Sequence, residues 1–170
     1  MPTSPPGLGM LLRHVLELLD GDLERVYKES GLDYRPRYTP VMRALIDLGP
    51  TPIRDIARHA STTHSAASQT VAQMARKGLL RLEPGADARE RVVRLTPRAR
   101  RMLPKLQAQW AATDAAAEAL SAELPCPLHD VLIAAIRALE MQPFRERIAL
   151  SARPSDETQP TTPARAKAGS

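Results

Sequence analysis

The sequence contains few of the residues that build disulfides, metal centres or aromatic-rich β-sandwiches. Its only cysteine is Cys126, which excludes an intrachain disulfide and a cysteine-based zinc site. Phe, Trp and Tyr make up 3% of the residues, so the core must be built from aliphatic side chains, and this favours helices. No apolar run approaches the roughly 18 residues of a membrane span, and the first ten residues lack the pattern of a secretory signal. We therefore expect a cytoplasmic protein without membrane association.

Sequence motifs of catalysis are also missing. There is no glycine-rich phosphate loop, no nucleophile elbow and no HExxH pair. The four histidines show no metal-ligand spacing beyond the adjacent pair His129 and Asp130. We therefore predict a protein that is not an enzyme and that carries neither a cofactor nor a metal.

Positive charge is present in excess, and it is local. The formal net charge is +5, but residues 76–105 alone hold ten Lys or Arg against three Asp or Glu. A basic stretch of this kind is the expected footprint of a nucleic-acid partner. The alternative is a merely solvated surface.

Helical periodicity accounts for both ends of the chain. Apolar residues recur with helical spacing over 8–26, and Gly31 is expected to end that helix. A second helix is predicted over 41–48. Near the C-terminus, Thr96 and Pro97 should start a long helix that contains a proline. A last helix is expected to carry Val131, Leu132, Ile136, Leu139 and Phe144.

Two short helices with a polar turn between them lie in the middle of the chain. We expect Thr51 to cap the first of them, with Pro52 at its first helical position. Thr63 should cap the second helix, 63–77, which Gly78 ends. Such a pair can place its second helix in the major groove of DNA.

Small apolar residues form the predicted inner face of helix 63–77, so its polar face is left for solvent or DNA. Gln can bond both edges of adenine, and Ser can bond several base edges. The residues predicted to contact DNA from this helix are His64, Ser65, Ser68, Gln69, Gln73, Arg76 and Lys77. The alternative is a solvated helix without a ligand.

A basic strand–loop–strand follows. Residues 79–82 and 92–95 read as strands, with Pro84-Gly85 opening the polar loop between them. Arg89 and Arg91, two apart, should point to one side, with Asp87 orienting Arg89 for a minor groove. Arg81 and Arg94 on the strands are predicted to meet phosphates; otherwise these are ordinary surface ion pairs.

Four short segments match one known pattern: Ile56-Ala57, Lys77-Gly78-Leu79, Asp87-x-Arg89 and Val93-Arg94-Leu95-Thr96. With them the chain resembles the MarR family of bacterial winged-helix regulators from about Leu8 to Ile148. It departs where Ala88 replaces the middle arginine of the family's wing motif and Ala99 replaces a frequent glycine.

The resemblance implies a mainly α fold with a small β-hairpin wing, and it implies a homodimer. Apolar excess on the first and last helices independently favours dimerisation. The expected organisation is a flexible leader (1–7), an N-terminal dimerisation helix and loop (8–36), a winged helix-turn-helix DNA-binding lobe (37–96), a long linker helix with a C-terminal dimerisation helix (97–149) and a disordered tail (150–170).

The sequence thus predicts a dimeric regulator that binds double-stranded DNA, a repressor that occludes a pseudo-palindromic operator. The family's usual response to small molecules adds the hypothesis of an effector pocket lined by Tyr34, Arg35, Arg37, Tyr38 and Trp110; the alternative is that these are packing and loop residues. Two rival functions remain open, a sequence-poor architectural DNA-binding protein and a winged helix that docks a protein partner.

Overall fold

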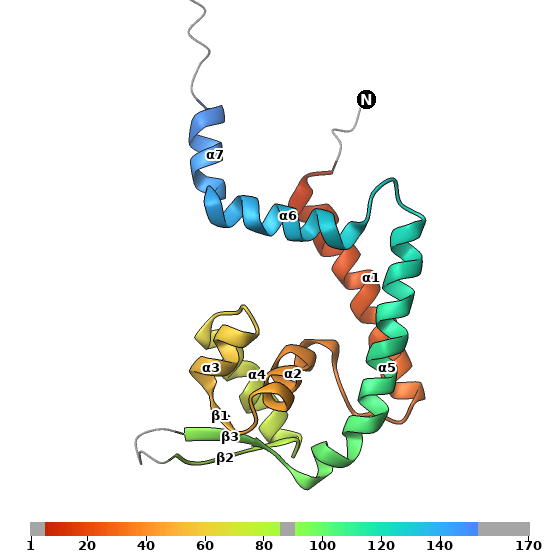
Figure 1. Ribbon diagram of the computed structural model, residues 1–170, viewed down its shortest axis with the longest axis vertical. Coiled ribbons are helices and arrows are strands. Elements are labelled where there is room, and N and C mark those ends of the chain that lie inside the picture. The colour runs from red at the N-terminus through yellow and green to blue at the C-terminus, as the bar shows by residue number, and fades with distance from the viewer. Residues whose placement is uncertain (1–5, 86–90, 153–170) are drawn as a thin grey trace, which may run out of the picture. The chain divides into compact units, whose positions relative to one another are not determined.

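The computed structural model describes residues 6–85 and 91–152 (Figure 1). Backbone contacts divide the chain into two units, one up to Thr113 and the other from Asp114 onwards. The first unit contains α1 (Leu8–Glu29), the 3₁₀ turn η1 (Pro36–Tyr38), α2 (Thr39–Asp47), β1 (Thr51–Pro52), α3 (Ile53–His59), α4 (His64–Arg76), β2 (Leu80–Pro84), β3 (Arg91–Leu95) and most of α5 (Pro97–Ala122). The predicted fold class, mainly helical with a small β wing, is confirmed.

Left-handed glycines end two of these helices in the same way. Gly31 has φ +69° and Gly78 has φ +68°, a conformation that side chains with a Cβ rarely adopt. Beyond α4, the N–H of Gly78 donates to Ala75 and that of Leu79 to Met74, both at 2.9 Å. This is the Schellman arrangement, which satisfies the last carbonyls of a helix. Both predicted helix ends are confirmed.

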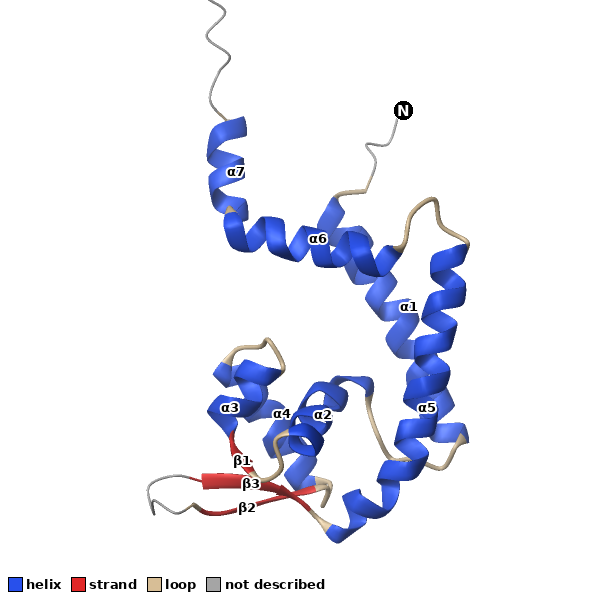
Figure 2. Cartoon of the chain, in the orientation of Figure 1, coloured by secondary structure: helices blue, strands red, loops and turns tan. Residues whose placement is uncertain are grey.

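The sheet has three antiparallel strands in the order β1–β3–β2 (Figure 2). Thr51 of β1 pairs with Val93, and on the other side of β3 Leu82 faces the same residue. The expectation that Thr51 caps α3 is therefore wrong, because its side chain is buried in the sheet. The N-cap residue is Pro52, which provides no side-chain cap.

The core of the first unit gathers almost all the aromatic residues of the chain. The rings of Tyr27, Tyr34 and Tyr38 meet edge to face, with centroids 5.1 Å and 5.7 Å apart in the two pairs. Trp110 from α5 packs into the same cluster, together with fully buried aliphatic residues such as Ile56 and Met74. Edge-to-face contacts stabilise such a cluster beyond simple burial, so a few rings hold α1, η1 and α5 around the shorter helices.

The second unit consists of the end of α5, α6 (Leu128–Met141) and α7 (Phe144–Ser151). One last helix was expected here, reaching Phe144, and the structure instead has two. Gln142 is extended (φ −137°, ψ 106°), because the ring of Pro143 disfavours a helical conformation in the residue before it. Helix α7 also continues to Ser151, beyond Ala149, where the tail was expected to begin; residues 153–170 lie outside the described part.

Neither α6 nor α7 buries a residue completely. Within residues 6–85 and 91–152, no helix is both long enough and apolar enough to cross a membrane.

Candidate nucleic-acid interface

Helix α4 is fixed at its start by a side-chain cap and along one face by the core. The hydroxyl oxygen of Thr63 accepts a hydrogen bond from the backbone N–H of Ala66 at 3.2 Å, as the sequence predicted. Ala67, Val71 and Met74 are buried at 1% exposure or less. Because these three residues recur at helical spacing, they fix the rotation of α4 about its axis. The opposite face of α4 is therefore exposed to solvent.

The outward face of α4 carries most of the predicted reading residues. Ser65, Gln69 and Arg76 are exposed and share one stripe, since their spacings of four and seven residues return to the same side of a helix. Ser68 and Gln73 flank the stripe and are half-buried. His64 is exposed in the first turn of α4. The structure thus places the predicted reading residues on one accessible surface of α4. Arg76 is the charged residue of the exposed stripe.

The end of α4 is tied to the start of α5 through Thr96. Its hydroxyl lies 2.7 Å from the carbonyl oxygen of Gly78 and 3.2 Å from that of Leu79. The same hydroxyl oxygen accepts a hydrogen bond from the N–H of Ala99 at 3.2 Å, so it also caps α5. Arg98 adds a bond from its guanidinium to the carbonyl of Lys77 at 3.0 Å. Sequence reasoning predicted the start of α5 but missed this connection to α4.

An acidic residue outside the predicted set lies at the end of α4. The ammonium group of Lys77 contacts both carboxylate oxygens of Asp33, at 2.9 Å and 3.1 Å. Arg98 approaches the same carboxylate at 3.7 Å. Lys77 was expected to contact DNA, and here its charge is largely compensated by Asp33. Asp33 and Lys77 are 44 positions apart in the sequence. A local sequence pattern therefore could not predict this ion pair.

The wing's charged residues are also partly compensated. Arg81 and Arg94 lie opposite each other on β2 and β3, and like charges in that position repel. Glu83 lies between them, 3.0 Å from Arg81 and 2.7 Å from Arg94. Arg91, at the start of β3, is exposed. The wing-tip residues Asp87 and Arg89, for which a minor-groove contact was predicted, lie outside the described residues.

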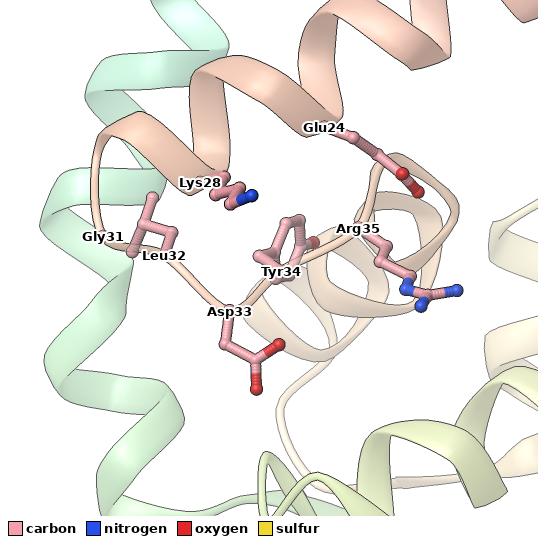
Figure 3. Close-up of a pocket in the computed structure, with 7 residues that line it drawn as sticks. All are labelled: Glu24, Lys28, Gly31, Leu32, Asp33, Tyr34 and Arg35. Atoms are coloured by element: carbon pink, nitrogen blue, oxygen red, sulfur yellow. The ribbon is translucent and has the colours of Figure 1, made fainter.

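Two cavities adjoin the loop between α1 and α2. One, of about 410 Å³, is lined by Glu24, Lys28, Gly31, Leu32, Asp33, Tyr34 and Arg35 (Figure 3). The other, of about 370 Å³, is lined by Arg35, Arg37, Tyr38, Gln73, Arg76 and Lys77. Arg35 belongs to both. The residues of the predicted effector pocket therefore do not line one common cavity. Arg35 and Arg37 line the second cavity together with Arg76 and Lys77 at the end of α4.

The aromatic members of that predicted pocket are mostly core residues. Trp110 is 8% exposed, lines neither cavity, and is covered by the guanidinium of Arg43, 5.0 Å from the ring centre. Tyr34 is 5% exposed, and burial raises the pKa of its phenol, which stays protonated and lies 3.4 Å from the hydroxyl of Thr39. The polar groups open to a ligand are therefore mainly the arginines.

Nothing in the described ranges, 6–85 and 91–152, indicates a metal centre. No group of three or more His, Cys, Asp or Glu side chains gathers there. Cys126 is an exposed thiol between α5 and α6.

The capped outward-facing helix, the helix before it and the three-stranded sheet with its hairpin together define a winged helix-turn-helix protein. The sequence of residues 30–90 matches the sequence model of the MarR family. No curated protein matches the chain.

Solved structures extend the likeness beyond that segment. A MarR family transcriptional regulator of Silicibacter pomeroyi is 27% identical, with a TM-score of 0.57 over 78% of this chain and 94% of that one. The regulator MosR of Mycobacterium tuberculosis, solved in complex with DNA, is 23% identical, with a TM-score of 0.62 and coverages of 80% and 98%. PcaV from Streptomyces coelicolor, in complex with its natural ligand, is 22% identical, with a TM-score of 0.58 and coverages of 82% and 94%.

The match over residues 30–90 and the likeness to the Silicibacter pomeroyi regulator support a winged helix-turn-helix transcriptional regulator of the MarR type. The resemblance stated from four short motifs is therefore confirmed.

Proposed function

We propose that two copies of this chain form a repressor that occludes a pseudo-palindromic operator in the cytoplasm. The single observation that carries the proposal is the outward stripe of α4, whose polar residues are presented by a buried opposite face and by anchors at both ends. A helix held in this way can enter a major groove without first having to be ordered. The structure of MosR with DNA supports the same use of the fold.

Uncovered apolar side chains support the dimer. On α1, Leu11, Val15 and Leu19 are 47%, 43% and 44% exposed. On α6, Val131 and Ile136 are 45% and 52% exposed. Apolar stripes of this length are costly to leave in water and are typical of protein contacts. A second copy would cover them and would give two reading helices about one DNA turn apart, which suits half-sites separated by ~10 base pairs.

A small-molecule effector is the finer part of the proposal. The two cavities beside the α1–α2 loop share Arg35, and they contact both the end of α1 and the end of α4. An anionic ligand there would be attracted by the arginines and would act on the reading helix directly. PcaV, which shares the fold, was solved with its natural ligand.

The deciding experiment combines the oligomeric state with a genome-wide selection of DNA fragments by purified protein. We expect a dimer by light scattering and a small set of enriched sites with two-fold sequence symmetry. A monomer that enriches no site would reject the repressor.

One observation favours an architectural binder as a second candidate. The reading stripe has no charged residue before Arg76, so its first turns lack the bidentate arginine–guanine pair, which is the commonest specific contact. That candidate predicts DNA binding without enrichment of any sequence in the same selection.

A further inference from the structure

The cavity between η1 and the second half of α4 carries an excess of positive charge. Four of its lining residues are cationic, namely Arg35, Arg37, Arg76 and Lys77, and none is acidic. Lys77 forms an ion pair with Asp33, which also contacts Arg98. Within residues 6–85 and 91–152, by contrast, Arg35, Arg37 and Arg76 form no ion pair with a carboxylate. Three exposed arginines therefore line one space of about 370 Å³ whose lining contains no acidic residue.

Two local features order the segment that carries Arg35 and Arg37. The guanidinium of Arg37 lies over the ring of buried Tyr38, 5.8 Å from its centre, and such a contact limits the orientations of the arginine. The N–H of Tyr38 donates to the carbonyl of Arg35 at 2.9 Å and closes η1. Arg35, just before η1, and Arg37, within it, therefore lie on a hydrogen-bonded turn.

Gln73 adds an unsatisfied polar group on the cavity wall. Its carboxamide oxygen is buried and has no hydrogen-bond partner in the part of the chain described. The NH₂ group of the same carboxamide is a hydrogen-bond donor, and the residue that carries it lines the cavity.

We infer that Arg35, Arg37, Arg76 and Gln73 form an oxyanion site that receives a phosphate group. Guanidinium groups pair with phosphate oxygens through two parallel hydrogen bonds, and several around one cavity fit a tetrahedral anion better than a single apolar or cationic ligand.

The geometry of α4 favours the DNA backbone as the source of that phosphate. Arg76 lies on the same stripe as Ser65 but about 16 Å farther along the helix axis, and the major groove is only about 12 Å wide. When the first turns of α4 lie over base edges, its last turn has reached the groove wall, where the phosphates are. This source rests on the proposed operator-binding function; the site itself does not.

The test uses the full-length protein and the variants Arg37→Ala, Arg76→Ala and Arg35→Ala. Arg25→Ala is the matched control, since it removes one positive charge from an exposed pair with Asp22 on α1. Binding to an arbitrary 25-base-pair duplex is titrated at several salt concentrations. Each lost phosphate contact should lower the slope of log affinity against log salt by about 0.9, and the loss should be equal for all sequences.

A second measurement follows the melting temperature of each protein in inorganic phosphate at constant ionic strength. Flattened salt slopes in the site variants, with Arg25→Ala like the wild type, support the site with a backbone phosphate. Slopes like the control, together with phosphate stabilisation that only the site variants lose, support the oxyanion site and overturn the DNA source. If both measurements leave the variants like the control, the site is overturned.

A wild-type protein that fails to bind any duplex would reject the proposed function, while the phosphate measurement would still judge the site. Circular dichroism of each variant confirms that it is folded. Arg37→Lys should keep most of the salt slope, because the slope depends on the charge that releases counter-ions.

Discussion

The hydroxyl of Thr96 joins the recognition helix to the long helix α5, and its removal gives a sharp test. In Thr96→Val the side chain keeps its shape but loses the bond to the carbonyl of Gly78 at 2.7 Å and the cap on the N–H of Ala99 at 3.2 Å. A helix cap contributes ~1 kcal/mol, and a partly exposed neutral hydrogen bond contributes roughly 0.5–1 kcal/mol. We therefore expect a loss of about 2 kcal/mol in the free energy of unfolding.

Urea denaturation at a fixed protein concentration measures this loss. With a denaturant dependence of ~2 kcal/mol per molar urea, the midpoint of Thr96→Val should fall by about 1 M. Thr96→Ser keeps the hydroxyl and loses only a methyl group, so its midpoint should stay close to that of the wild type. Equal midpoints for Thr96→Val and Thr96→Ser would show that the hydroxyl does not fasten α4 to α5.

Three further outcomes follow from the interface and the uncovered helices. Gln69→Ala should reduce the preference for the selected site over other DNA by about 1–3 kcal/mol in competition gel shifts; an equal loss on all sequences would place Gln69 against backbone. Asp33→Asn frees Lys77, so affinity for arbitrary duplex DNA should rise in low-salt titrations while stability changes by less than ~1 kcal/mol; a rise of the same size in Asp22→Asn would mean that net charge alone acts. Ile136→Glu should convert the dimer to a monomer in light scattering, and an unchanged mass would remove α6 from the dimer contact.

Features of the fold that depend on neighbouring residues in the sequence could be predicted. Thr63 caps α4 because a hydroxyl can reach the N–H three residues later. Gly78 ends the same helix because glycine tolerates a positive φ. The buried face of Ala67, Val71 and Met74 follows from their spacing alone.

Features that depend on distant partners could not be predicted. Thr51 has the composition of a helix cap, but pairing with Val93, 42 residues later, draws it into the sheet. The Asp33–Lys77 pair and the bonds of Thr96 to the end of α4 likewise join residues far apart in the chain. For the same reason, Arg35 and Arg37 were grouped with nearby tyrosines, whereas the fold joins them to Arg76.

Trp110 is the only tryptophan of the chain. It lies with Leu106 where α5 packs against the core of the first unit, and the guanidinium of Arg43 covers its ring. Its intrinsic fluorescence therefore reports on this one contact without any label. Opening of the contact to water would shift the emission to longer wavelengths, and excitation at the red edge of the absorption band would select this ring over the three tyrosines.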